Sequence, residues 1–139
     1  MIAKISEQDR LLHAALHTSG HLLNWELSQF GWKAIKGHHF PGESRVEFSP
    51  MDSNVLPSEQ LPLQKVESSI KMKLHEGRKV TTWFEENDRL CLIEGCTPIP
   101  CAGTHVDDLN KIDEFSIKSI KFKKGILRIS YDASHIAMV

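Results

Sequence analysis

Apolar residues recur at helical spacing through the first thirty positions of the chain. They fall three, four or seven residues apart, at Leu12, Leu16, Leu23, Leu27 and Phe30. Such a stripe is typical of an amphipathic helix that packs on a core. Ser6 is a candidate N-cap, and acidic residues follow it in the first turn. Gly31 is a residue at which the helix is expected to end. The pattern therefore predicts one long helix between Ser6 and Gly31.

A second stripe with the same spacing follows in the middle of the chain, at Leu63, Val66, Ile70 and Leu74. The segment Ser58–Pro62 is expected to start this helix, because proline is tolerated in a first turn. Gly77 is expected to end it. Three lysines, Lys65, Lys71 and Lys73, lie off the stripe and are expected to be solvated. The stripe itself predicts packing on a sheet.

Branched and aromatic residues mark six expected strands, at residues 32–36, 44–49, 80–84, 90–93, 114–122 and 126–131. The last two are expected to pair as a hairpin across Lys123–Gly125. Within residues 114–122 the alternation of apolar positions slips near Lys118, which predicts a β-bulge. The fold class that follows is α+β: a two-layer domain with two helices packed on one mostly antiparallel sheet.

Composition narrows the class of protein further. The 139 residues, with 40% hydrophobic and 25% charged residues, suit a single domain spanning residues 1–139. We expect a cytoplasmic protein, because no signal-peptide core and no run of about 18 apolar residues occurs. Three cysteines do not make a disulfide framework. A formal net charge of -1 excludes nucleic-acid binding through bulk charge, so any RNA contact needs a local basic face.

Two short motifs carry the candidate chemistry. His17 and His21 are four residues apart, which places two imidazoles on one helix face. Cys101 and His105 have the same separation around small residues that suit a tight loop. Neutral imidazole and thiolate are preferred zinc ligands, so the two pairs together indicate a zinc site. Spacing alone does not choose between these histidines and the pair His13/His17.

The other cysteines and histidines are weaker candidates for the metal site. Cys91 lies in an apolar run and is expected in the core. Cys96 is a rival thiolate, but no histidine follows it four residues later. At most one of His38 and His39 can face the metal if that segment is extended. Either could line an amino-acid pocket, or both could be ordinary turn residues.

These motifs resemble the editing domain of alanyl-tRNA synthetases and its freestanding relatives, the AlaX family. The related editing domain of threonyl-tRNA synthetases has the same general plan. The segments that carry the resemblance are His17-Thr-Ser-Gly-His-Leu-Leu23, Lys36-Gly-His-His-Phe-Pro-Gly42, Arg45-Val-Glu-Phe48 and Pro100-Cys-Ala-Gly-Thr-His-Val106. The resemblance implies four zinc ligands: His17, His21, Cys101 and His105. Thr18 and Thr104 are weaker catalytic candidates. Ala102 stands where relatives commonly have glycine.

The activity that the resemblance implies is zinc-dependent hydrolysis of mischarged alanine tRNA, by a trans-editing aminoacyl-tRNA deacylase. The removed group is expected to be serine, or else glycine. The expected partner is aminoacylated tRNA, with no membrane and no DNA. Substrate contacts are expected from His38 and His39 and from the basic hairpin residues Lys121, Lys123 and Lys124.

Two other functions remain open on sequence grounds. The chain could be an RNA-binding module with a purely structural zinc, because four protein ligands usually close a zinc site. It could also be a zinc hydrolase of a small-molecule ester. Catalysis at a site with four ligands would need one loosely held ligand, with His105 as the candidate, or expansion to five-coordination.

Overall fold

A computed structural model describes residues 7–101, 103 and 105–136. The helices are α1 (Glu7–Ser28) and α2 (Leu63–Glu76), and short 3-10 turns occur at Ser58–Gln60 and Leu109–Lys111. The strands are β1 (Trp32–His38), β2 (Arg45–Pro50), β3 (Val80–Glu85), β4 (Asp88–Ile93), β5 (Ile99–Pro100), β6 (Ile112–Lys123) and β7 (Ile126–His135). Within the described ranges, no helix combines the length and apolar character that crossing a membrane requires.

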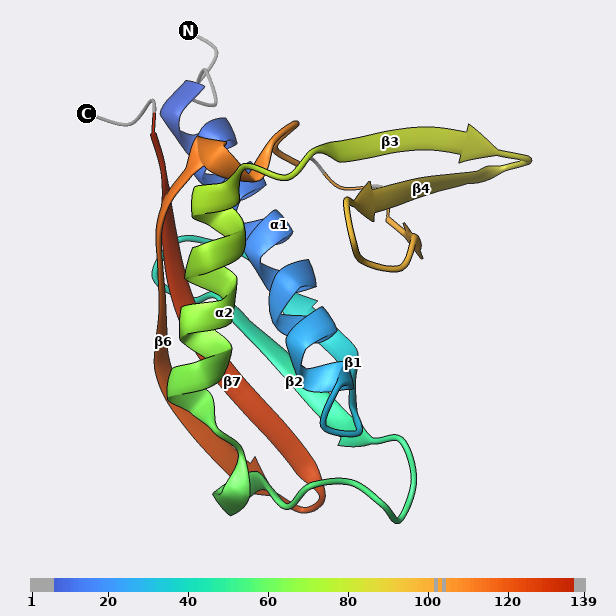
Figure 1. Cartoon of the computed structure of the whole chain (residues 1–139), viewed down its shortest axis with the longest axis vertical. Coiled ribbons are helices and arrows are strands. Elements are labelled where there is room, and N and C mark those ends of the chain that lie inside the picture. Colours follow the sequence, from blue (N-terminus) through green and yellow to red (C-terminus); the bar gives the residue numbers. More distant parts are fainter. Residues whose placement is uncertain (1–6, 102, 104, 137–139) are drawn as a thin grey trace, which may run out of the picture.

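The larger sheet has the strand order β1-β2-β7-β6, and all of its pairings are antiparallel. Both helices lie against the same face of it (Figure 1). Leu16 and Leu23 of α1, Ile70 of α2 and Ile129 of β7 are fully buried between the layers. Burying each such side chain contributes about 1.5–3 kcal/mol. The predicted α+β two-layer fold is confirmed.

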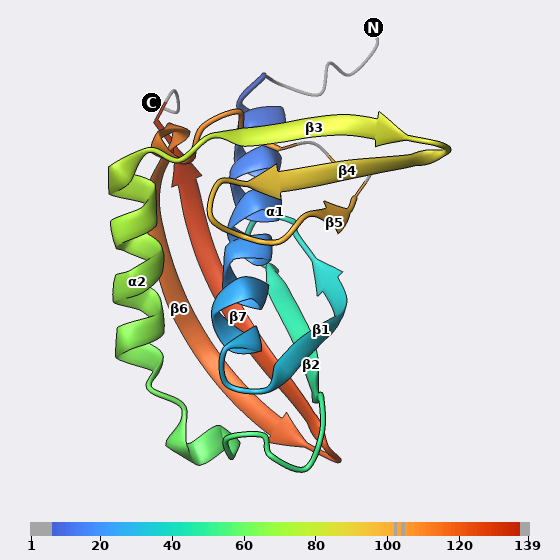
Figure 2. The ribbon, with the colours of Figure 1, turned by 45° about the vertical axis from the view of Figure 1, so that its right-hand side comes forward.

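The strands β3, β4 and β5 form a second antiparallel sheet. In Figures 1 and 2 the β3–β4 hairpin extends sideways from the upper end of the two layers. Phe84, near its tip, is 75% exposed, whereas Cys91 and Ile93 at its base are buried. The expected strands are therefore present, and they make two sheets. The base of the small sheet leads directly into the loop that carries Cys101.

The predicted irregularity in the terminal hairpin is confirmed. The register between β6 and β7 shifts between Ile117 and Ser119, which leaves Lys118 as the extra residue of a bulge. The turn follows at Lys124, which has a positive φ of 53°. These two features set which faces the basic side chains of β6 occupy.

The start of the second helix differs from the prediction. Residues 58–60 form a separate 3-10 turn, and Leu61 is extended with φ -63° and ψ 127°. The ring of Pro62 disfavours helical backbone in the residue before it, so α2 begins only at Leu63. The helix ends as predicted, with Gly77 in the left-handed conformation at φ 73°. Ser6, the predicted cap of the first helix, lies outside the described residues.

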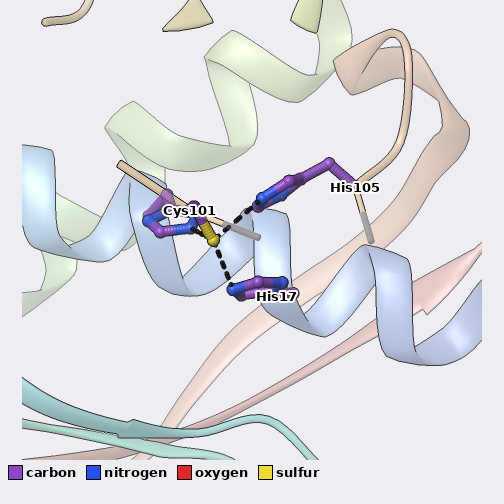
Figure 3. Close-up of side chains that lie close together, drawn as sticks. His17, Cys101 and His105 are labelled. Carbon is purple, nitrogen blue, oxygen red and sulfur yellow. Dashed lines mark hydrogen bonds between the residues drawn. The ribbon is translucent and has the colours of Figure 1, made fainter. Parts of the chain in front are cut away.

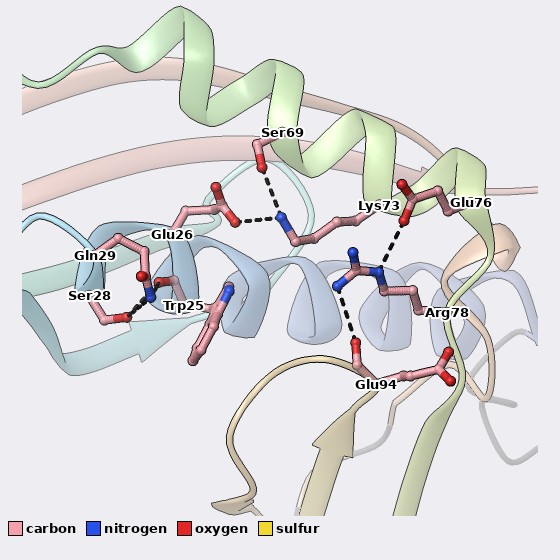
Figure 4. Close-up of polar contacts among 9 residues, drawn as sticks. All are labelled: Trp25, Glu26, Ser28, Gln29, Ser69, Lys73, Glu76, Arg78 and Glu94. Carbon is pink, nitrogen blue, oxygen red and sulfur yellow. Dashed lines mark hydrogen bonds and ion pairs between the residues drawn. The ribbon is translucent and has the colours of Figure 1, made fainter.

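Lys73 is also a correction, because it is not a solvated charge. Its side chain is 14% exposed, and its Nζ lies 2.8 Å from Oε2 of Glu26 on α1. The same Nζ donates to the Ser69 hydroxyl at 2.8 Å. The pair joins the two helices across their interface, and Figure 4 shows it beside the Arg78–Glu76 contact at the end of α2.

Candidate metal centre

Four side chains from the two sequence motifs converge on one point. His17 and His21 come from successive turns of α1, and Cys101 and His105 come from the loop after β5. Their ligand atoms all lie within 4.8 Å of one another. The Nε2 atoms of the three histidines lie 3.2–3.3 Å from the Cys101 Sγ. Figure 3 shows the rings of His17 and His105 directed at this sulfur. The group could hold a metal ion.

The chemistry of the donor set fits a cation better than a set of hydrogen bonds. One thiol has a single proton and is a weak acceptor, so it cannot satisfy three imidazoles. Two ligands of a tetrahedral zinc stand about 3.5 Å apart when Zn–S is about 2.3 Å and Zn–N about 2.0–2.1 Å. The observed separations are a few tenths of an ångström shorter. Small outward movements of the side chains would therefore admit the ion.

The local electrostatics keep the imidazoles in the form that binds metal. Burial, followed by the fields of His105, His17 and His39, lowers the pKa of His21 from 6.5 to about 2. Burial and neighbouring positive groups, His17 first and then Arg89, lower the pKa of His105 to about 3. Both rings are thus neutral at physiological pH, with a lone pair to donate.

The loop that carries the second motif is held against α1 by a glycine and an arginine. A Cβ at Gly103 would overlap the Cε1 and Nδ1 atoms of the His17 ring, so only glycine lets the backbone approach this closely. Arg89 of β4 donates from Nη1 to the Gly103 carbonyl at 3.2 Å. Sequence reasoning missed Arg89, because nothing in its local sequence links it to the loop. Ala102 and Thr104 lie outside the described residues.

Thr18 lies behind the metal group. The residue is fully buried, its Oγ1 lies 3.2 Å from Nδ1 of His105, and it accepts a hydrogen bond from the Val106 amide at 3.2 Å. A partner on Nδ1 leaves Nε2 of His105 to face the Cys101 sulfur. This position suits orientation of His105, and it does not suit direct contact with a substrate.

His39 packs against the metal group, whereas His38 does not. The His39 ring centroid is 4.7 Å from that of His17, and its Nδ1 lies 2.7 Å from the Tyr131 hydroxyl. Tyr131 donates its own proton to the Leu16 carbonyl at 2.6 Å, so His39 must donate from Nδ1. His38 instead contacts Phe40 and lies 3.8 Å from Glu43.

Two glycines form the slot that holds the His39 ring. A Cβ at Gly20 of α1 would lie 2.6 Å from the ring, and a Cβ at Gly37 of β1 would also lie 2.6 Å from it. Burial and the field of His17 lower the pKa of His39 to about 4. The ring is therefore a fixed, neutral wall of the site. The sequence signal for the buried position of His39 was the pair of glycines. Its meaning is clear only when the structure shows that α1 and β1 lie side by side.

A small pocket opens beside His21. Its volume is about 190 Å³, and it is lined by His21, Asn24, Trp25, Ser28, Cys91, Ile93, Cys96, Thr97 and Ile99. Burial raises the pKa of the Cys91 thiol to about 11, and burial also raises that of Cys96. Neither sulfur belongs to the group of four ligand atoms among the described residues. Cys91 is a core residue, as predicted, and Cys96 lines the pocket wall.

The basic residues of the terminal hairpin separate into two places. Lys121 lines a hollow of about 250 Å³ together with Arg45, Lys118 and Arg128. Lys123 ends β6, next to the turn, and both it and Lys124 are exposed. The turn lies at the opposite end of the large sheet from the β3–β5 sheet (Figures 1 and 2). The structure does not bring Lys123 and Lys124 to the metal group.

Comparison with known proteins agrees with the motifs. The chain is 28% identical over 110 residues to the alanyl-tRNA editing protein AlaX-M of Pyrococcus horikoshii. The match covers 79% of this chain and 48% of that protein, so the chain spans about half the length of this relative. No protein-family model matches the chain. The predicted resemblance is confirmed, because the chain is similar to this AlaX protein over most of its own length.

Proposed function

We propose that this protein is a zinc-dependent aminoacyl-tRNA deacylase that removes a mischarged amino acid, serine or else glycine, from alanine tRNA. One observation carries the proposal. Two motifs 80 residues apart meet as a histidine, histidine, cysteine and histidine group, in a chain similar to a protein named for alanyl-tRNA editing. The RNA-binding module and the small-ester hydrolase share the metal group but do not account for that similarity.

The proposed ligands are His17, His21, Cys101 and His105. When bound, zinc would polarise the ester carbonyl and activate water for its hydrolysis. The chain's own residues then have three tasks. Thr18 orients His105, and Arg89 and Gly103 hold the loop on the His17 ring. The neutral His39 ring excludes water from one side of the group.

The pocket beside His21 is the proposed place for the acyl group. Its 190 Å³ suits a small side chain, and Asn24 and Thr97 supply polar atoms among apolar walls. The Asn24 Oδ1 already accepts from the Ala34 amide, and the Ser28 hydroxyl already donates to the Trp25 carbonyl. Selection of serine over alanine would therefore depend on the Asn24 Nδ2 and the Thr97 hydroxyl, to which a methyl group cannot hydrogen-bond, at about 1–3 kcal/mol each. Correctly charged alanine tRNA should then be spared, since hydrolysing it would drain protein synthesis.

A deacylation assay tests the proposal. The zinc-loaded protein is mixed in excess with seryl, glycyl and alanyl forms of alanine tRNA, and release of the amino acid is followed. We expect cleavage of the seryl form, slower cleavage of the alanyl form, loss of activity on chelation and recovery with zinc. Binding without cleavage would favour the structural-zinc module. Activity on small esters alone would favour the small-molecule hydrolase.

A further inference from the structure

Beside the metal group lies a cluster of rings that the proposed chemistry does not use. Phe40 lies with its ring centroid 5.5 Å from that of His13 and 4.9 Å from that of His38. His13 in turn lies 6.0 Å from the ligand His17. We name His13, His38 and Phe40 the aromatic shelf. Phe40 is 52% exposed, so its ring adds little to the core and leaves an aromatic surface open to solvent at the edge of the site.

The shelf is held in a fixed turn. The Phe40 carbonyl accepts from the Glu43 amide at 3.0 Å and from the Ser44 hydroxyl at 2.9 Å. Ser44 is 3% exposed, and its own carbonyl accepts from the Tyr131 amide at 3.1 Å. The turn is therefore tied to β7. An exposed ring on a tied turn is a preorganised contact surface, because little conformational entropy remains to be lost on binding.

The same turn leads into the hollow described above, which we name the basic hollow. Four of its lining residues are cations, Arg45, Lys118, Lys121 and Arg128, and of the described residues that line it only Glu43 is acidic. Arg128 also pairs with Glu47 at 3.5 Å. Lys118 and its neighbour Ser119 both line the hollow, although side chains alternate in a regular strand. The bulge at Lys118 explains how both reach it.

We propose that the aromatic shelf and the basic hollow form one track for the unpaired 3′ end of an RNA. Phe40 stacks on the terminal base, and the cations of the hollow bind the backbone phosphates that follow. Aromatic rings beside a positively charged groove are the usual means of holding single-stranded nucleic acid. Residues 42–45, which follow Phe40 in the chain, all line the hollow. Arg45 and Arg128 alternate with residues buried under the helices, so the hollow lies on the opposite face of the large sheet and the RNA would pass over this turn to reach it.

This inference rests on the proposed function, which fixes where each end of the substrate lies. The ester joins the amino acid to the terminal ribose, so the terminal base must lie next to the metal group. The rest of the RNA must leave toward solvent. The open shelf meets that need, whereas the pocket beside His21 is small enough to enclose only the acyl group.

The first test compares two exposed phenylalanines. Phe40→Ala is compared with Phe84→Ala, a matched control on the β3–β4 hairpin, and with Phe40→Trp. Binding of an uncharged minihelix of alanine tRNA with its single-stranded 3′ end is measured by fluorescence anisotropy. We expect Phe40→Ala to weaken binding about tenfold, and Phe84→Ala and Phe40→Trp to leave it within about twofold.

The second test concerns the phosphates. The double variant Arg45→Ala/Lys118→Ala should flatten the salt dependence of minihelix binding by about 0.7 per lost single-strand contact. Lys65→Ala/Lys71→Ala, on the exposed side of α2, is the matched control and should not change the slope.

The outcomes separate this inference from the proposed function, because binding of uncharged RNA does not depend on hydrolysis. Wild-type protein that binds the minihelix but cleaves no acylated tRNA would overturn the proposed function and leave the track standing. Wild-type protein that cleaves acylated tRNA while Phe40→Ala and Phe84→Ala bind alike would overturn the track. Wild-type protein that binds no minihelix would overturn it as well.

Discussion

Helix α1 carries two partly buried polar clusters that differ in how far their polar groups are satisfied. Near its C-terminal end, Glu26 pairs with Lys73 of α2, with opposite charges 2.8 Å apart, and the Lys73 Nζ also donates to Ser69 (Figure 4). Further toward its N-terminal end, His17 and His21 meet Cys101 and His105 (Figure 3). The first cluster balances its own charge. The second brings together four donors of electron pairs, and burial and the fields of neighbouring groups lower the pKa of His21 and His105 and so oppose their protonation.

The comparison shows how a structural polar cluster differs from one that is suited to bind a ligand. A cluster of opposite charges is complete, and its contribution is to stability and to the register of the two helices. A cluster of like ligands gains its stability from an ion that binds all of them. Substitutions should therefore affect different properties at the two places.

The largest effect is expected at the metal group. Cys101→Ser, His17→Ala and His21→Ala should reduce bound zinc from about one ion per chain to a small fraction, because each removes one of the four proposed ligands and its share of the binding free energy. Deacylation should fall at least about 100-fold, since the chemistry depends on the ion. Elemental analysis and a single-turnover assay measure the two results. Cys91→Ser and Cys96→Ser are the controls and should retain zinc. A zinc-free Cys96→Ser protein would show that the ligand set is wrong.

The next effect is expected at the charge pair, and on stability alone. Glu26→Gln should lower the free energy of unfolding by about 3 kcal/mol, because it leaves the Lys73 ammonium without its partner. Bound zinc should stay near one ion per chain. Denaturant unfolding of the zinc-loaded protein measures the change.

A matched surface pair sharpens this test. Lys71 lies 3.7 Å from Glu67 on the exposed side of α2, so Lys71→Ala should change the free energy of unfolding by less than about 0.5 kcal/mol. Replacing both partners, as Glu26→Leu/Lys73→Met, should recover much of the loss. If Glu26→Gln removed zinc as well, the two clusters would not be independent.

A smaller effect is expected at Tyr131, which links α1 to the wall of the metal group. Tyr131→Phe leaves the buried Leu16 carbonyl without its hydroxyl donor and should cost about 1–2 kcal/mol of stability. Because His39 also loses its partner, the deacylation rate should fall severalfold while zinc stays bound. Unchanged activity together with lost stability would assign Tyr131 to the fold alone.

The smallest effect is expected at the terminal hairpin, outside both clusters. Changing Lys121, Lys123 and Lys124 together to alanine should weaken tRNA binding and flatten its salt dependence, since each lost phosphate contact removes released counterions. Cleavage of a minimal acylated fragment at saturating concentration should survive. Lys123→Ala/Lys124→Ala should have less effect than Lys121→Ala, because only Lys121 lines the basic hollow. If all three variants bind tRNA as tightly as the wild-type protein does, these lysines are ordinary solvated charges.

The local pattern of apolar and polar residues was sufficient to predict most of the helices and strands. Periodicity predicted both helices, and the slipped alternation at Lys118 predicted the bulge, because each depends on residues a few positions apart. The convergence of the two metal motifs was predicted from ligand chemistry and family resemblance. The late start of α2 was missed because the restriction that Pro62 places on Leu61 outweighed the tolerance of proline in a first turn.

Contacts between distant segments could not be predicted from one sequence. Lys73 and Glu26 are 47 residues apart, and the hydrogen bond from Tyr131 to Leu16 joins residues 115 apart. The slot of His39 needs Gly20 and Gly37 to face each other across two elements. Each of these depends on how the layers pack, and no periodicity within a single element records that.

The separation of 80 positions between His21 and Cys101 also sets the order of events during synthesis. A chain that is still being translated exposes the two helix histidines early, but the ligand set is complete only after residue 105 has emerged. Closing a loop of this length costs about 4–5 kcal/mol in chain entropy. Binding of an ion by all four side chains is therefore possible only after strands β3 to β5 have been synthesised, whereas β6 and β7 of the large sheet follow later in the chain. Under the proposed function, a nascent chain would gain deacylase activity only after residue 105 has emerged.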